Sequence, residues 1–137
     1  LEAYASATAL IKQAQKAMES DKESLLWKLT DGNKENVNGK IVFNALRKGD
    51  KAAEKVVKKY TEYLTAGVTN VINAFHPQAI VLGGGICAAG DMFLTPLKRK
   101  VNRGIFGGTK FAPVGIVVAS LGNDAGIYGA AVLAMNR

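Results

Sequence analysis

The sequence feature that most constrains the fold is an apolar segment that runs directly into three glycines, AIVLGGGI at residues 79–86. Short apolar runs without polar alternation are typical of strands in parallel sheets, whose two faces are both covered. The glycines remove every Cβ from the turn that follows, so the backbone can adopt positive φ and approach a ligand closely. The segment therefore predicts either a nucleotide-binding turn at Gly83, Gly84 and Gly85 or a tight turn without a ligand.

The same pattern of strand, turn and helix occurs a second time. The apolar run GIVVA at residues 115–119 is followed by SLGNDAG at 120–126 and then by a segment rich in small residues. Two successive β-α units predict a parallel sheet with packed helices and right-handed crossovers, so we expect an α/β fold. Asn123 and Asp124 at the second turn have two interpretations: they belong to a nucleotide site, or they cap the final helix.

Helical periodicity accounts for most of the remaining chain. The longest segment, residues 51–75, repeats apolar residues at spacings of three and four, with Asp50 as its N-cap and Pro77 beyond its end. Gly67 interrupts this segment, and close packing against another helix is a reason for a glycine there. The expected helices cover residues 3–19, 24–29, 41–46, 51–75, 92–101 and 127–134.

Charge and cysteine content limit the class of protein. The net charge is +7, but the lysines are spread along helical faces without interleaved aromatic residues, which favours a solvated basic surface over nucleic-acid binding. Cys87 is the sole cysteine, so the chain has no internal disulfide and fits a reducing compartment such as the cytoplasm. No apolar run approaches the roughly 20 residues of a bilayer span, so we expect no membrane association.

Two common sequence motifs of nucleotide-binding proteins are absent. No glycine is followed by Lys and Ser or Thr at the spacing of a Walker loop. The spacing G-x-G-x-x-G also fails, because the third residue after Gly85 is Ala88. These absences argue against P-loop and dinucleotide-binding proteins.

Four motifs together resemble the C-terminal part of a ROK-family sugar kinase (repressor, open reading frame, kinase), and bacterial ROK glucokinases most of all. The motifs are IVLGGGI at 80–86, LGNDAG at 121–126, FNALRKGD at 43–50 and NVINAFHP at 70–77. The resemblance covers essentially the whole chain. The two glycine motifs follow the long helix in this order and at this spacing. Together they make the resemblance more specific than either motif would alone.

The resemblance implies that residues 1–137 are the C-terminal nucleotide-binding domain of an actin-like, ribonuclease-H-like ATPase fold, with ATP in a cleft between two domains. It also implies Mg²⁺ with ATP, and a structural zinc, in the parent protein. The family's phosphate-binding loop, catalytic aspartate and zinc-binding residues are absent from this sequence. We therefore expect no catalytic residue and no metal ligand in the chain, and no phosphorylation of glucose by the chain alone.

The resemblance also implies site residues. Gly83, Gly84 and Gly85 would contact the adenosine part of ATP, with Asn123 and Asp124 nearby in support. Glu2 would bind sugar hydroxyls, because a carboxylate can accept hydrogen bonds from two adjacent hydroxyls.

Two other functions remain open at this point. One is a sugar-responsive transcriptional repressor of the same family, with a DNA-binding segment upstream of this chain. The other is a small basic interaction domain without a nucleotide role. The chain opens on Leu1 rather than on methionine, and we expect a piece of a longer protein that self-associates through the apolar helix at 127–135.

Overall fold

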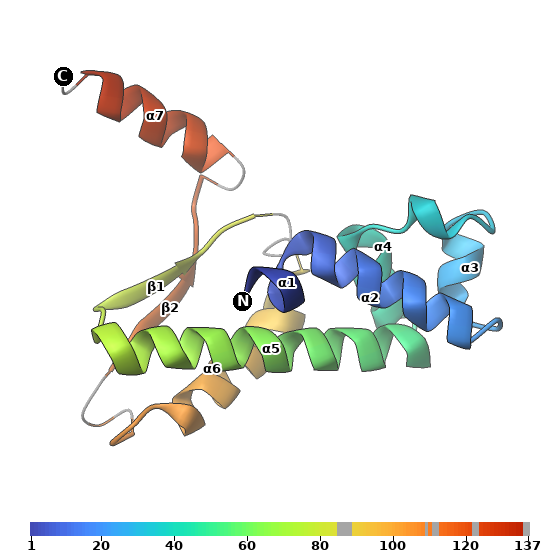
Figure 1. The fold of residues 1–137 in the computed structure, drawn as a ribbon, viewed down its shortest axis with the longest axis horizontal. Coiled ribbons are helices and arrows are strands. Elements are labelled where there is room, and N and C mark those ends of the chain that lie inside the picture. Colours follow the sequence, from blue (N-terminus) through green and yellow to red (C-terminus); the bar gives the residue numbers. More distant parts are fainter. Residues whose placement is uncertain (85–88, 109, 111–112, 122–123, 136–137) are drawn as a thin grey trace.

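A computed structural model describes residues 1–84, 89–108, 110, 113–121 and 124–135. Helices dominate it, and two strands form one parallel sheet (Figure 1). The elements in chain order are α1 (Glu2–Ala5), α2 (Ala7–Ser20), α3 (Leu25–Leu29), the short 3₁₀ helix η1 (Lys34–Asn36), α4 (Gly39–Arg47), α5 (Lys51–Phe75), β1 (Ala79–Leu82), α6 (Asp91–Gly104), β2 (Gly115–Val118) and α7 (Ala125–Met135).

The long helix α5 is the element on which α1, α2, α4 and α6 pack. Its buried side chains recur at spacings of three and four, as the sequence predicts. The N-cap prediction is also confirmed, because the Asp50 carboxylate accepts a hydrogen bond of 2.7 Å from the Ala53 backbone N–H. The buried residues of α5 are Ala52, Ala53, Val56, Val57, Tyr60, Thr61, Leu64, Val68 and Ile72.

Two backbone features lie within α5 and at its end. A Cβ added at Gly67 would clash with Leu1 Cδ1, so this position is closely packed, but by the residue that precedes α1 and not by another helix as the sequence predicts. His76 adopts a left-handed conformation with φ of 50° and donates its backbone N–H to the Ile72 carbonyl at 2.9 Å. His76 is therefore the C-terminal cap of α5, directly before Pro77.

The prediction of one continuous helix over residues 3–19 is wrong. Ser6 is extended, with φ of −88° and ψ of 169°, and separates α1 from α2. The Ser6 hydroxyl accepts a hydrogen bond of 3.0 Å from the Ala9 backbone N–H and so caps α2. Helix α6 also exceeds its predicted end and runs to Gly104, where the Ile105 N–H bonds to the Val101 carbonyl.

The parallel pairing of β1 with β2 is confirmed, with Ala79 opposite Gly115 and Leu82 opposite Val118. The prediction that both faces of the strands are covered is wrong for the described residues. Ile116 is buried and packs against the core, whereas Val81 on β1 is 63% exposed. Helix packing covers only one face of this sheet, so the apolar residues of the other face contact solvent.

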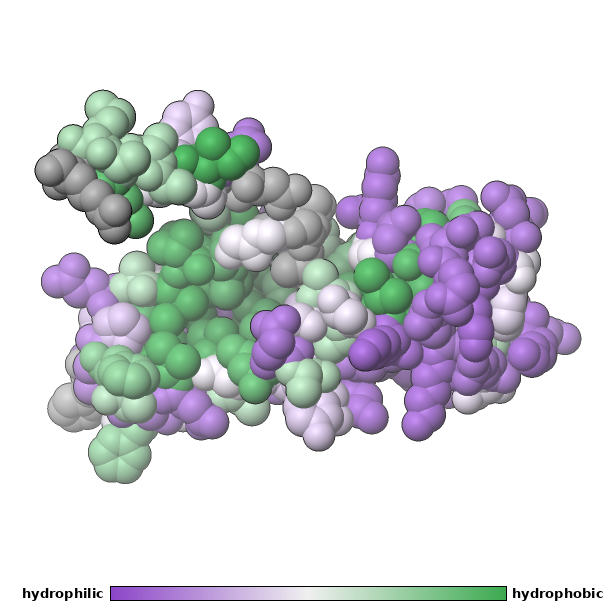
Figure 2. Space-filling model, turned by 45° about the horizontal axis from the view of Figure 1, so that its top comes forward, coloured by the Kyte–Doolittle hydropathy of each residue, from purple (hydrophilic) through white to green (hydrophobic). Residues whose placement is uncertain are grey.

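Helix α7 follows β2 and stands apart from the other helices (Figure 1). Figure 2 shows apolar side chains over α7 and the sheet, and hydrophilic side chains over the opposite end of the molecule. In the part of the chain that the structure describes, no helix is both long enough and apolar enough to cross a bilayer. The large exposed apolar residues of α7 are Ile127, Tyr128, Val132, Leu133 and Met135.

We expect Asp50→Ala to destabilise the chain by about 2–3 kcal/mol in chemical denaturation. Besides capping α5, the Asp50 carboxylate accepts from the Leu25 N–H at 2.7 Å and from the Ser24 hydroxyl at 3.1 Å. Asp21→Ala is the control, because the Asp21 carboxylate accepts only from the exposed Glu23 N–H among the described residues, and a loss below about 0.5 kcal/mol is expected. Equal losses in both variants would contradict this account of Asp50.

We expect the chain to self-associate through the exposed apolar surface of α7, in a manner that light scattering detects. The double variant Ile127→Lys/Leu133→Lys adds charge to that surface and should shift the mass towards the monomer. The control is Phe75→Lys/Phe106→Lys, which changes two side chains that are 77% and 87% exposed elsewhere. A monomeric wild type at high concentration, or the same shift in both variants, would refute the expectation.

Candidate functional site

The predicted glycine turn lies at the carboxyl end of β1, in open space. Gly83 and Gly84 are both exposed, and a Cβ added at either residue would meet nothing within 4 Å. Gly84 has φ of 89°, a conformation that favours glycine. The turn therefore presents bare main chain at the edge of a parallel sheet; the third glycine, Gly85, lies outside the described residues.

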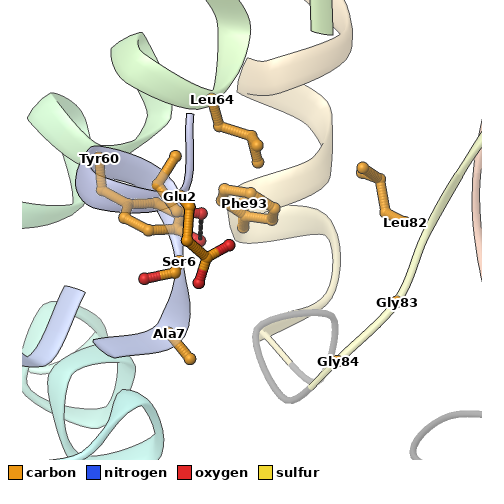
Figure 3. Close-up of a pocket in the computed structure, with 10 residues that line it drawn as sticks. Glu2, Ser6, Ala7, Tyr60, Leu64, Leu82, Gly83, Gly84 and Phe93 are labelled. Atoms are coloured by element: carbon orange, nitrogen blue, oxygen red, sulfur yellow. Dashed lines mark hydrogen bonds between the residues drawn. The ribbon is translucent and has the colours of Figure 1, made fainter. Parts of the chain in front are cut away.

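A pocket of about 290 Å³ adjoins this turn. It lies between α1, the middle of α5, the start of α6 and the end of β1 (Figure 3). Residues far apart in sequence thus meet around one cavity. The lining residues are Glu2, Ala5, Ser6, Ala7, Tyr60, Leu64, Leu82, Gly83, Gly84 and Phe93.

Two aromatic rings form part of the pocket wall. Tyr60 and Phe93 are each 2% exposed, and their ring centroids lie 6.1 Å apart at 50°. Leu64 from α5 adds an aliphatic surface beside Phe93 (Figure 3). An apolar wall with a few polar groups at its edge is the usual composition of a small-molecule site.

Glu2 supplies the carboxylate of this pocket. Figure 3 shows the Glu2 side chain reaching into the space that Gly83 and Gly84 border from the opposite side, whereas the Ser6 hydroxyl points away from the glycines and caps α2. The Glu2 carboxylate has no hydrogen-bond partner among the described residues. It can therefore accept hydrogen bonds from a ligand with hydroxyl groups without breaking an existing contact.

Helix α1 is held in place mainly by contacts with α5. The Tyr60 hydroxyl donates to the Ala5 carbonyl at 2.9 Å, a bond drawn in Figure 3. The Tyr4 ring lies 5.0 Å from the Tyr63 ring, centroid to centroid. These contacts place Glu2 at the pocket although it precedes the glycine turn by some 80 positions.

The second predicted turn does not line this pocket in the described residues. Asp124 is exposed, directly precedes α7 and donates its backbone N–H to the Leu121 carbonyl at 3.0 Å. Asn123 and Cys87 lie outside the described residues.

Sequence reasoning missed Ser6, Tyr60 and Phe93 as pocket residues. Tyr60 and Phe93 lie on apolar helical stripes, which made them core candidates, and both are indeed buried. The one available signal was the Tyr60 hydroxyl, because a buried tyrosine needs a hydrogen-bond partner.

Comparison with known proteins gives the family. The model of the ROK family matches residues 1–137, which is the entire sequence. The chain belongs to the ROK family. The ROK resemblance seen in the sequence motifs is therefore confirmed.

Similar ROK proteins include bacterial glucokinases. The chain is 37% identical over 138 residues to a glucokinase of Thermotoga maritima, covering 100% of the chain and 43% of the relative. It is 33% identical over 135 residues to a glucokinase of Streptomyces coelicolor, covering 97% and 43%. A more distant relative is a xylose repressor of Caldicellulosiruptor bescii, at 24% identity over 77% of the chain and 26% of the repressor.

A solved structure agrees with this assignment. The ROK glucokinase of Streptomyces griseus, crystallised with glucose and AMPPNP, superposes with a TM-score of 0.83 at 32% identity. The match covers 96% of this chain and 43% of that structure. The chain therefore spans less than half the length of the glucokinases that it matches.

The described residues hold no group of three or more His, Cys, Asp or Glu side chains placed to bind a metal. The zinc and Mg²⁺ implied by the ROK resemblance thus have no donor set to which they can be fitted in this part of the chain.

We expect Tyr60→Phe to lower the free energy of unfolding by about 1 kcal/mol, because the Ala5 carbonyl loses its donor. Tyr63→Phe is the control: it keeps the ring that contacts Tyr4 and removes a hydroxyl from another position on α5. Urea denaturation of both variants measures the difference. If Tyr63→Phe costs as much as Tyr60→Phe, the bond to α1 is not the cause.

Proposed function

We propose that this chain is the C-terminal ATP-binding part of a ROK glucokinase that transfers a phosphoryl group from ATP to glucose. The observation that carries the proposal is the shared pocket of Glu2 with Gly83 and Gly84, since it joins a sugar-type acceptor to a nucleotide-type turn. The likeness to a glucokinase crystallised with glucose and AMPPNP supports it. On this proposal, residues 1–137 are an actin-like, ribonuclease-H-like ATPase domain of a cytoplasmic enzyme of carbohydrate breakdown.

The proposed roles follow from side-chain chemistry. Glu2 accepts hydrogen bonds from glucose hydroxyls and fixes the orientation of the sugar. Gly83 and Gly84 bring main chain against adenosine, and Gly85 continues that surface. Asn123 and Asp124 support the nucleotide from the second turn.

Phosphoryl transfer also needs groups that this chain does not contain. A base must take the proton of the sugar hydroxyl, and charge on the phosphates must be stabilised. In the parent protein, Mg²⁺ bound with ATP would supply part of the positive charge that stabilises the phosphates. We therefore expect the isolated chain to show no turnover in a coupled glucose-phosphorylation assay, and turnover by the isolated chain would contradict this division of roles.

Kinetics of the parent protein test the site. Glu2→Gln should lower kcat/KM for glucose roughly 10- to 100-fold, the loss expected for a hydrogen bond to a charged acceptor. Gly84→Val should raise KM for ATP, because a branched side chain at positive φ displaces the main chain from the nucleotide.

Matched controls separate these effects from general damage. Gly32→Val places the same side chain at φ of 75°, with equally open surroundings, in a turn away from the pocket. Glu23→Gln removes one carboxylate charge from an exposed position. The proposed site is wrong if Glu23→Gln lowers kcat/KM for glucose as much as Glu2→Gln does, and Gly32→Val raises KM for ATP as much as Gly84→Val does.

The alternative proposal is a sugar-responsive ROK repressor, which the xylose repressor likeness supports. The glucokinase likeness is stronger in identity and coverage. The coding sequence upstream of Leu1 decides between them, because a phosphate-binding loop favours the kinase and a helix-turn-helix favours the repressor.

A further inference from the structure

Helix α1, which carries Glu2, is too short to maintain its own conformation. A helix of four residues is not stable in water, and the last carbonyl groups of any helix lack partners within it. The Glu2 carbonyl accepts from the Ser6 N–H at 3.3 Å, which is a long bond. The carbonyls of the last two residues, Tyr4 and Ala5, accept from side chains of other helices.

The two side-chain donors come from different helices. Gln13 on α2 donates its Nε2 to the Tyr4 carbonyl at 2.9 Å. Tyr60 on α5 donates its hydroxyl to the Ala5 carbonyl, also at 2.9 Å. Successive residues of an α-helix lie about 100° apart around its axis, so the two bonds hold α1 at two points of its circumference. Together they resist rotation of α1, which one bond alone would allow, and this rotation sets the direction in which the Glu2 side chain leaves the helix.

The Gln13 side chain lies in an unfavourable environment. Its Oε1 is buried and has no donor among the described residues. A buried carbonyl oxygen without a donor is destabilising, and an apolar side chain of similar length would avoid this penalty. Stability alone therefore does not account for a glutamine at this position, whereas a role in orienting α1 does.

We propose that Gln13 is a positioning residue for the sugar-binding carboxylate of Glu2. Its amide fixes the rotation of α1, so that Glu2 points into the pocket that Gly83 and Gly84 border from the other side (Figure 3). Gln13 acts through α1, because it is not among the described residues that line this pocket. The inference rests on the proposed function, since it takes Glu2 as the group that binds the sugar hydroxyls.

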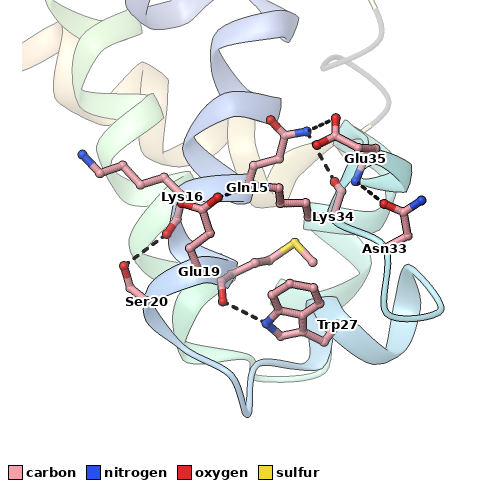
Figure 4. A network of polar contacts seen from close by, with 9 residues as sticks. Gln15, Lys16, Glu19, Ser20, Trp27, Asn33, Lys34 and Glu35 are labelled. Carbon is pink, nitrogen blue, oxygen red and sulfur yellow. Dashed lines mark hydrogen bonds and ion pairs between the residues drawn. The ribbon is translucent and has the colours of Figure 1, made fainter.

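The chain offers a matched control on the same helix. Gln15 lies two positions further along α2 and, like Gln13, is half-buried. Its Nε2 donates to the Glu35 carboxylate at 3.1 Å, so this amide joins α2 to η1 (Figure 4). Gln13→Met and Gln15→Met therefore remove the same donor group from one helix, but the bond to α1 is lost in Gln13→Met alone.

Amide hydrogen exchange of the 137-residue chain tests the contact itself. Gln13→Met should speed exchange of the Ala5 and Ser6 N–H groups by about fivefold or more, because these groups are exposed when α1 moves. Gln15→Met should leave both rates within about twofold of wild type. Unchanged rates in Gln13→Met, or equal increases in both variants, would overturn the proposal whatever the activity of the protein.

Kinetics of the parent protein test whether Gln13 acts through Glu2. Gln13→Met should raise KM for glucose about tenfold and leave KM for ATP within about twofold, because only the sugar-binding carboxylate is displaced. In a protein that already carries Glu2→Gln, the same change should lower kcat/KM for glucose by no more than about twofold further, since residues that act as a unit are not additive. Gln15→Met should change neither KM.

Each other outcome has a distinct meaning. An unchanged KM for glucose in Gln13→Met, an equal rise in KM for ATP, or losses that multiply in the double variant would show that Gln13 does not act through Glu2, and would overturn the proposal. If Glu2→Gln alone leaves the kinetics unchanged, the proposed sugar site is wrong and this inference falls with it. The exchange rates at α1 then still report whether Gln13 holds the helix, so the two failures are distinguished.

Discussion

Burial of one face of α5 is the interaction on which most of the helical core depends. Helices α1, α2, α4 and α6 all pack against α5, and buried aliphatic side chains contribute roughly 1.5–3 kcal/mol each. Helices as short as α1 and α3, with four and five residues, are not stable in water by themselves. Helix α1, which forms part of the wall of the glycine pocket, packs on α5, whereas α3 packs on α4.

The sequence predicted the features whose cause is local. The periodicity of residues 51–75, the Asp50 cap and the glycine turn after β1 each depend on neighbouring residues, and each was predicted in place. The break at Ser6 was missed because the alanine-rich segments on either side favour a continuous helix. The Ser6 hydroxyl instead bonds to the Ala9 backbone N–H and starts a new helix as its N-cap. The roles of Tyr60 and Phe93 in the pocket depend on long-range packing, which periodicity does not specify.

The sheet shows why hydrophobicity alone did not predict burial. Val81 and Val117 are as apolar as strand residues covered on both faces, yet they are 63% and 46% exposed. The sequence gives the hydrophobicity of a side chain, but a side chain is buried only where another element packs on it. The described elements cover only the face of the sheet that carries Ile116. In the longer kinase that we propose, this open face is available for contacts that the present chain does not make.

The interruption at Ser6 has a consequence for ligand binding. Because α1 is separated from α2, its direction is determined by α5, through the Tyr60 hydroxyl and the close approach of Leu1 to Gly67. The orientation of the Glu2 backbone is thus established when the chain folds. If Glu2 has the role that we propose, sugar binding restricts only its side chain, so the entropy lost on association is smaller than for a carboxylate carried on an unstructured terminus.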